Sequence, residues 1–318
     1  MRKTYTFIFF SCSILLLNAQ TREEGPWWPN KLWGPDDQAG ASNWITPEKI
    51  LEARQWITEG KVYELGHVYD QQMFVPDNRV FKLFIPSFPT YGPEGPDQIV
   101  FNDELLVATI GQVGTQFDGL GHPGRRMQME DGSATEVFYN GFNTAEMKSP
   151  FGLQNLGVEK IKPIITSGIL IDIAGSLDKE ILDDAYVVSL PDVQKALARQ
   201  GIRNDDITPG DAIFFNFGWW HNWNKDYVMD GKRLPSISRE VVDWLIDRQP
   251  SIVGSDAILD GPVYNVHMEL TMKNGIFNLE WMTFESLLED NVYQFFFNFT
   301  PLRIKGATGS PGRPIAIR

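Results

Sequence analysis

The stretch Gln112-Val-Gly-Thr-Gln116-Phe-Asp118-Gly-Leu-Gly-His122 places two amides, one carboxylate and one imidazole within eleven residues. Gln116 and Asp118 are two residues apart, so on an extended backbone their side chains point to the same side. Gln112 lies four residues earlier and can join them. The glycines that follow Asp118 permit a bend that returns His122 to the same place. This spacing suits a metal site, although similar segments also occur in solvated loops without chemistry.

The composition excludes several classes of partner. The chain has 318 residues, of which 42% are apolar and 13% aromatic, enough for a sizeable core in one large domain or two small ones. Its formal net charge is −13 at pH 7. Nucleic acids and anionic membrane surfaces attract basic patches, so neither is an expected partner.

The first twenty residues resemble a secretory signal. Arg2 and Lys3 precede the apolar run 6–17, which is too short to span a bilayer. We expect residues 1–20 to be a signal peptide and the mature chain, 21–318, to be secreted or periplasmic. An uncleaved membrane anchor is the alternative.

The only cysteine, Cys12, lies inside this apolar run. If the run is removed, the mature protein contains no thiol. A disulfide, a thiolate metal ligand and a cysteine nucleophile are then all excluded, and so is a cysteine-rich structural zinc site.

The remaining pattern predicts a mixed α/β domain. Thr46 caps a helix that we expect to run to Gly60, and helical periodicity recurs at 190–198 and 238–246. A turn is expected at 207–211. Strand-like runs occur at 61–65, 99–101, 105–110, 168–173, 212–217 and 252–254, and the run 105–110 is expected to lead directly into the motif. Neither a Gly-x-Gly-x-x-Gly motif nor a P-loop is present, so nucleotide binding is not supported.

A second segment can complete a metal site. Glu280 ends the apolar run that starts at Gly275, and a carboxylate there is costly unless it is paired or bound to a cation. His267 lies nearby in the sequence, although a histidine considered by itself more often has a structural role in the core or at the surface. Oxygen donors with one or two imidazoles suit Mn²⁺, Zn²⁺ or Fe²⁺.

Aromatic residues offer a possible wall for an aryl or cyclic substrate. Ordinary core packing remains open for each of them. His221 lies within the cluster 219–223, where it could join a substrate site, whereas His67 is expected to be structural. The candidates for substrate contact are Trp27, Trp28, Trp219, Trp220 and Phe284.

These motifs resemble the cyclase family of metal-dependent hydrolases, which includes bacterial kynurenine formamidase and isatin hydrolase. The family pattern His-x-Gly-Thr-His-x-Asp-x-x-x-His is matched by residues 112–122, with glutamine at the two leading histidine positions. This looks like a variant branch with Gln-x-Gly-[Ser/Thr]-Gln-x-Asp. Further segments resemble family blocks: 33–43, 168–172, 209–211 and 254–256.

The resemblance implies a swivelling β/β/α cyclase-like fold and a divalent metal ion, Mn²⁺ or Zn²⁺, with one or two ions per chain. It implies that His122 is the general acid/base. The implied metal ligands are Gln112, Gln116, Asp118, His267 and Glu280.

The implied activity is metal-dependent hydrolysis of a carbon–nitrogen or ester bond in a small cyclic amide, formamide or lactone. The arylformamidase reaction of tryptophan catabolism is the best-known example in the family. The alternative is a non-catalytic small-molecule-binding protein that keeps the fold. The expected partners are a small-molecule substrate and further copies of the chain, as a homodimer or higher homo-oligomer, with no membrane contact after signal cleavage.

Overall fold

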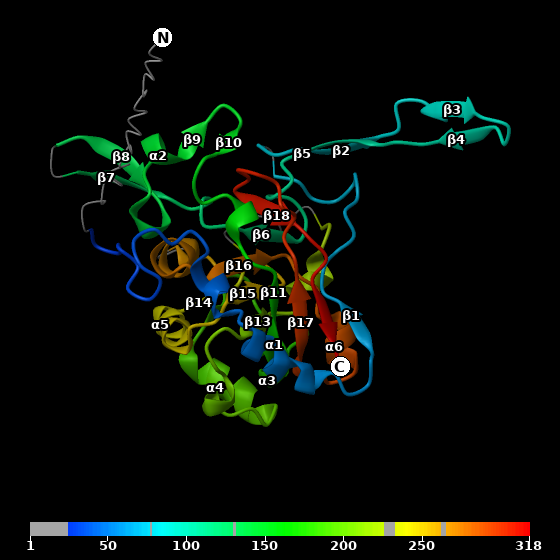
Figure 1. The fold of residues 1–318 in the computed structure, drawn as a ribbon. Helices are drawn as coiled ribbons and strands as arrows, with labels where there is room; N and C mark the ends of the chain where they lie inside the picture. The colour runs from blue at the N-terminus through cyan, green and yellow to red at the C-terminus, as the bar shows by residue number, and fades with distance from the viewer. Residues whose placement is uncertain (1–24, 77, 130–131, 226–232, 262–264) are drawn as a thin grey trace, which may run out of the picture.

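The protein is represented by a computed structural model that describes residues 25–76, 78–129, 132–225, 233–261 and 265–318 (Figure 1). The predicted signal peptide, residues 1–20, lies outside the described residues. Within the described part of the chain, no helix has the length and apolarity needed to cross a membrane.

A nine-stranded mixed sheet forms the centre of the molecule. Four neighbouring strands, β11, β13, β15 and β16, run parallel, and every other pairing in the sheet is antiparallel. The strands in spatial order are β1 (Val62–Glu64), β19 (Ile315–Ile317), β17 (Gln294–Phe299), β11 (Ile164–Asp172), β13 (Ala212–Asn216), β15 (Ile252–Ser255), β16 (Phe277–Glu280), β6 (Gln116–Asp118) and β18 (Gly309–Pro311).

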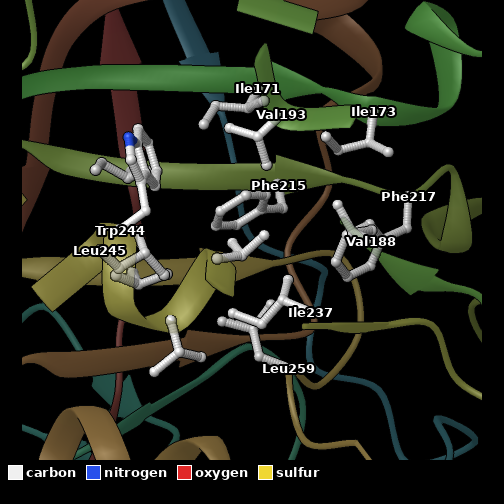
Figure 2. Packing of buried hydrophobic residues seen from close by; sticks show 14 of the residues in the cluster. Ile171, Ile173, Val188, Val193, Phe215, Phe217, Ile237, Trp244, Leu245 and Leu259 are labelled. Carbon is white, nitrogen blue, oxygen red and sulfur yellow. The ribbon is translucent and has the colours of Figure 1, made fainter. Parts of the chain in front are cut away.

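The sheet separates two hydrophobic cores. Side chains on a strand alternate between its faces, so Phe215 of β13 joins one core while Phe214 joins the other. Figure 2 shows the first core, in which Phe215 lies among side chains that include Trp244 and Leu245 of helix α5 (Arg239–Arg248). Because both faces of the central strands are covered, these strands are mostly apolar, as in the run Ala212–Phe215 of β13.

Short helices surround the sheet. Helix α4 (Leu190–Arg199) begins at a capping box in which Ser189 and Asp192 each accept a hydrogen bond from the other's backbone N–H. In helix α1 the Thr46 side chain caps the backbone N–H of Lys49. The helices other than α5 are α1 (Pro47–Ala53), α2 (Thr144–Met147), α3 (Ile173–Ser176), α4 (Leu190–Arg199) and α6 (Glu285–Glu289).

Most predicted elements are confirmed, with shifted ends. The helix expected to reach Gly60 ends at Ala53 and continues only as a 3₁₀ turn to Trp56. The strand expected at 168–173 begins earlier, at Ile164, because its first half pairs with β17. The predicted helices at 190–198 and 238–246 correspond to α4 and α5.

The runs 99–101 and 105–110 form strands as predicted, β4 (Ile99–Phe101) and β5 (Leu105–Ala108), but the expectation that the second strand leads directly into the motif is wrong. They form an arm that extends from the body (Figure 1). Strand β5 ends at Ala108, and the motif strand β6 begins only at Gln116. The arm consists of two ribbons, β2 (Phe81–Phe84) with β5 (Leu105–Ala108) and β3 (Tyr91–Glu94) with β4 (Ile99–Phe101). The other small pairs are β7 (Arg125–Gln128) with β8 (Ala134–Val137), β9 (Lys148–Ser149) with β10 (Gly152–Leu153), and β12 (Val187–Val188) with β14 (Ser236–Ile237).

One buried carboxylate has a structural role beyond the end of β15. Asp256 is almost completely buried and accepts hydrogen bonds from the backbone N–H groups of Phe217 and Trp220, at 2.9 and 3.2 Å. Burial raises the pKa of Asp256 to about 7, although these backbone donors oppose the shift.

This shift predicts a pH dependence of stability. The folded chain holds the proton of Asp256 more tightly than the unfolded chain, whose ordinary pKa is 3.8. The free energy of unfolding should therefore lose stabilisation as the pH rises from that value to about 7, and then level off. Asp256→Asn should remove this component, so that its stability relative to the parent increases with pH by at most ~1.4 kcal/mol per unit. Urea unfolding across this range measures it, and parallel curves for both proteins would contradict the assignment.

Candidate metal centre

Two antiparallel strands position the motif. In β6 and β16, Asp118 lies opposite Asn278 and Gln116 lies opposite Glu280. Phe117 and its partner Leu279 pack into the second core, so the four polar side chains lie together on the other face. The prediction that Gln116 and Asp118 share one side is confirmed.

His267 is the meeting point of these side chains. Its Nε2 atom lies 3.0 Å from Asp118 Oδ2, 3.0 Å from Glu280 Oε1 and 3.1 Å from Asn278 Nδ2. An imidazole nitrogen carries at most one hydrogen, so hydrogen bonding cannot satisfy all three neighbours. The arrangement fits a cation that the nitrogen and both carboxylate oxygens share.

The other ring nitrogen of His267 contacts a carboxylate that fixes the orientation of the ring. His267 Nδ1 lies 2.9 Å from Asp260 Oδ2, which also fixes the start of the π-helical turn Met268–Met272 through backbone N–H donors of Val266 and His267. A carboxylate on the far nitrogen is the usual support of a metal-bound histidine.

Burial and neighbouring charges shift the pKa values of the residues in this centre. Burial would lower the pKa of His267, but Glu280, Asp118 and Asp260 outweigh it and raise this pKa well above its ordinary value. Burial and the neighbouring Asp118 raise the pKa of Glu280. Burial opposes ionisation of Asp118 too, yet contacts with His267 and His122 keep its pKa below the ordinary value. The centre is therefore an anionic site that favours positive charge.

The two glutamines brace the carboxylates. Gln112 Nε2 donates to Asp118 Oδ1 at 2.6 Å, and Gln116 Nε2 donates to Glu280 Oε2 at 2.8 Å. Gln112 Oε1 is buried and has no hydrogen-bond partner among the described residues. Because an unpaired buried carbonyl is costly, this oxygen is available to a cation. The donor set thus fits a divalent metal ion.

A glycine turn returns His122 to this centre. The backbone N–H of His122 donates to the carbonyl of Gly119, and a Cβ on Gly119 would lie 2.8 Å from the backbone carbonyl oxygen of Thr308, so this close approach favours glycine. His122 Nε2 lies 3.8 Å from Asp118 Oδ1. One ligand atom each from Asp118, His122 and His267 lies within 4.8 Å of the others, close enough for a common ion.

A cavity of about 730 Å³ opens over the centre. Its polar floor consists of Gln112, Gln116, His122, His267 and Glu280. The rest is largely apolar, and its polar members are Arg79, Arg125, Asp260 and Asn265. The apolar lining includes Phe74, Trp223, Leu234, Ile258, Met268, Met272 and Trp281. A small molecule with an apolar body fits such a site.

The aromatic residues predicted to contact substrate do not line this cavity. Trp219 and Phe284 are buried in the two cores, because strand and turn geometry directs them inward. Trp220 stacks on His221, with ring centroids 3.6 Å apart. Trp27 and Trp28 pack edge to face on each other in the loop that precedes α1.

The neighbouring residues Trp223 and Trp281 take this position instead. Trp223 stacks parallel to His67, with ring centroids 4.2 Å apart, and burial lowers the pKa of His67 to about 4. His67 therefore supports the cavity wall, and His221 does not enter the cavity. Both tryptophans were visible in the sequence, but their orientation depends on tertiary contacts.

Asn278 and Asp260 are site residues that the sequence did not reveal. Asn278 Nδ2 donates to Glu280 Oε1 at 2.8 Å and to Asp118 Oδ2 at 3.3 Å. The alternation of a strand could have indicated Asn278, since it lies two residues before Glu280. For Asp260, which lies in a loop, the sequence offered no comparable signal.

Comparison with known proteins gives a consistent result. Residues 30–259 match the Cyclase family. No curated protein matches the chain. A crystal structure described as a novel cyclase superposes with a TM-score of 0.77 at 28% identity, covering 90% of this chain and 98% of that chain.

Isatin hydrolase A from Ralstonia solanacearum superposes with a TM-score of 0.55 at 18% identity, covering 86% of this chain and 98% of its own. The enzyme of the same name from Labrenzia aggregata, bound to benzyl benzoate, gives 0.56 at 18% identity, covering 80% and 93%. At this level of identity the likeness concerns the fold. The predicted mixed α/β cyclase-like fold is confirmed.

The contacts predict that substitutions of Asp118 and Asp260 weaken metal binding to different extents. Asp118→Asn removes a carboxylate from the centre itself, whereas Asp260→Asn alters only the group that orients His267. Asp260→Asn should weaken metal binding by roughly 10–100-fold, the usual cost of such a support, and Asp118→Asn should cost more. Metal titration of both variants by calorimetry tests this order, which equal losses or a reversed order would refute.

The two cavity histidines should also differ. His267 is 12% exposed and contacts both carboxylates, whereas His122 is 29% exposed and lies farther from them. His122→Ala should keep most of the metal and lose roughly 10²–10⁴ in rate, the usual contribution of a general acid/base. His267→Ala should lose metal first and activity as a consequence. Metal content and turnover are measured on the same preparations, and a metal-free His122→Ala protein would show that His122 is mainly a ligand.

Proposed function

The chain belongs to the cyclase family, and we propose that it is a metal-dependent hydrolase of a small cyclic amide, formamide or lactone. The arrangement around His267 is the main support for this proposal. Two buried carboxylates and one imidazole nitrogen meet at one point, below a largely apolar cavity. Such a combination suits hydrolysis of a polar bond attached to an apolar body.

The proposed ligands are Gln112, Gln116, Asp118, His267 and Glu280. Four of the five offer an amide or carboxylate oxygen, and the amide nitrogen of each glutamine also donates to one of the two carboxylates. Oxygen-rich sets favour harder ions, so we propose Mn²⁺ or Zn²⁺, with Mn²⁺ preferred and one or two ions per chain.

A bound divalent ion would polarise the scissile carbonyl and lower the pKa of a water molecule, so that hydroxide forms near neutral pH. His122 acts on the proton. Its partly exposed ring lines the cavity, where it takes the proton from the attacking water and passes it to the leaving nitrogen or oxygen. The carbonyl–nitrogen or carbonyl–oxygen bond breaks, and the products are a carboxylate and an amine or alcohol.

The neighbouring residues hold this machinery in place. Asp260 fixes the ring orientation of His267, and Asn278 bridges the two central carboxylates by donating to both. Trp223 and Trp281, with ring centroids 6.2 Å apart, form part of the wall against which an aryl group would pack.

The test begins with protein stripped of metal by a chelator and reloaded with Mn²⁺, Zn²⁺ or Mg²⁺. Each form is assayed against isatin as a cyclic amide, an aryl formamide and an aryl lactone. We expect metal-dependent hydrolysis of at least one class. A protein that binds metal and these compounds without hydrolysing any of them would instead be the non-catalytic binding protein.

The position of Trp223 in the cavity wall predicts a specific effect on substrate hydrolysis. Trp223→Ala should lower kcat/KM for an aryl substrate by roughly 10–100-fold, because apolar contact equivalent to ~1.4–2.8 kcal/mol is lost. Trp220→Ala is the matched control, since this nearby tryptophan lies outside the cavity. Steady-state kinetics of both variants decide, and an equal loss in Trp220→Ala would contradict this wall.

A further inference from the structure

Two arginines line the cavity outside its polar floor, and neither forms an ion pair with a carboxylate in the described part of the chain. Arg79 lies at the base of the arm, shortly before β2, and Arg125 is the first residue of β7. Both segments continue as two-stranded ribbons outside the central sheet (Figure 1). The cavity therefore receives positive charge from two elements that are far apart in the sequence.

A backbone carbonyl holds Arg79 in place. Its Nη1 atom donates to the carbonyl oxygen of Gln112 at 2.6 Å, and the side chain is half-buried. Among the described residues this is the only hydrogen bond of the Arg79 side chain. A guanidinium carries several further N–H donors, which remain for solvent or a ligand. Partial burial of a cation without an anionic partner is costly, so a bound anion would stabilise this arrangement.

The register of the β7–β8 ribbon directs Arg125 toward the cavity. Residues that pair across antiparallel strands share a face, and Arg125 lies opposite Val137, which is 1% exposed. The next residue, Arg126, lies opposite Glu136 on the other face, with Nη1 3.7 Å from Oε1. Of these adjacent arginines, the one without a carboxylate partner among the described residues is therefore the one that lines the cavity.

The acidic residues of the cavity are engaged at the metal centre. Among the described lining residues only Asp260 and Glu280 are acidic. Both contact His267, and Glu280 also accepts hydrogen bonds from two amide side chains. Neither forms an ion pair with an arginine of the cavity. The positive charge of Arg79 and Arg125 is therefore not compensated within the described cavity.

The charge of the cavity is opposite in sign to the charge of the chain. The formal net charge of the whole sequence is −13 at pH 7. A divalent ion at the centre would neutralise Asp118 and Glu280, and the two arginines then outnumber the remaining carboxylate, Asp260. Local positive charge in a cleft of an acidic protein raises the concentration of an anionic ligand there and nowhere else.

We propose that Arg79 and Arg125 bind a carboxylate of the substrate, remote from the bond that is hydrolysed. This inference rests on the proposed function and narrows its substrate class to a small amide, formamide or lactone with an anionic group on its apolar body. The planar N–H donors of a guanidinium match the two oxygens of a carboxylate. A cavity of about 730 Å³ leaves room for an aryl body as well as the group that is hydrolysed.

A charged subsite also explains how a flat substrate is oriented. Apolar contact with Trp223 and Trp281 is non-directional, so the wall alone permits several orientations of an aryl ring. A carboxylate held by the arginines selects the orientation in which the opposite end of the molecule reaches the metal centre. Polar groups placed in a largely apolar pocket generally fix ligand orientation in this way.

Matched substrates that differ only in charge test the subsite. Isatin-5-carboxylate and isatin-5-carboxamide form one pair, and 4-formamidobenzoate and 4-formamidobenzamide form the other. The measured quantity is the ratio of kcat/KM for the charged member to kcat/KM for the neutral member, on preparations of known metal content. Arg125→Gln and Arg79→Gln should each lower this ratio roughly tenfold, the usual loss for a hydrogen bond to a charged group. Arg125→Lys keeps the positive charge and should retain part of the preference.

Arg126→Gln is the matched control, because it removes the neighbouring positive charge from the other face of the same ribbon. Its ratio should equal that of the parent. The subsite is refuted if the control loses as much as Arg125→Gln. It is also refuted if Arg125→Gln slows both members of a pair equally, since the arginine would then act on the reaction and not on the carboxylate.

Ligand binding separates this inference from the proposed function. Indole-5-carboxylate and indole-5-carboxamide contain no bond to hydrolyse, and calorimetry measures their binding to metal-loaded and metal-stripped protein. The carboxylate should bind roughly tenfold more tightly in both forms, and Arg125→Gln should remove this preference.

The combined outcomes are distinct. Preference for the carboxylate without hydrolysis of any substrate would refute the proposed function alone. Hydrolysis of both members at equal rates, with equal binding of both indoles, would refute the subsite alone. A preference that survives in Arg79→Gln/Arg125→Gln but disappears on metal removal would mean that the carboxylate binds the metal, and this result also overturns the proposal.

Discussion

Two buried carboxylates that approach one imidazole nitrogen impose the constraint on which the site depends. Taking an ionised group out of water costs several kcal/mol even after relaxation, and Asp118 and Glu280 are both nearly inaccessible. Without a metal, the protein reduces this cost by holding protons, since the pKa values of His267 and Glu280 are raised. A divalent cation would offset the cost of the buried charges more completely, because it attracts both carboxylates and accepts the nitrogen lone pair.

The hydrophobic core holds this costly arrangement in place. Phe117 lies between Gln116 and Asp118, and its ring packs on Phe277 and Phe299 at centroid distances of 5.1 and 5.3 Å. A slip of β6 by one residue would expose Phe117 and drive the polar side chains into the core. The register that satisfies the core is therefore the register that assembles the site, and the free energy for the strained centre comes from aromatic packing behind it.

This coupling explains what the sequence could reveal. The two-residue spacing of Gln116 and Asp118 is local information, and it correctly placed both side chains on one face. The central strands and the helices α4 and α5 were likewise visible in periodicity and capping residues. Which tryptophan faces the cavity was not visible, because tertiary contacts bury Trp219 in the first core and place Trp223 at the cavity. The arm could not be predicted for a related reason, since an apolar run predicts a strand but not the layer that covers it.

The way the arm joins the body explains how so long an insertion is compatible with the central sheet and its metal centre. Val80 and Thr109 are hydrogen-bonded to each other, so the long insertion between them begins and ends at one point. An insertion closed in this manner adds little conformational cost to the sheet, since the entropy of loop closure grows only slowly with length. The metal centre does not need the residues beyond this point for its own geometry. The root of the arm is nevertheless tied to the site, because Arg79 donates to the backbone carbonyl of Gln112 and the backbone N–H of Gln112 donates to the carbonyl of Thr109.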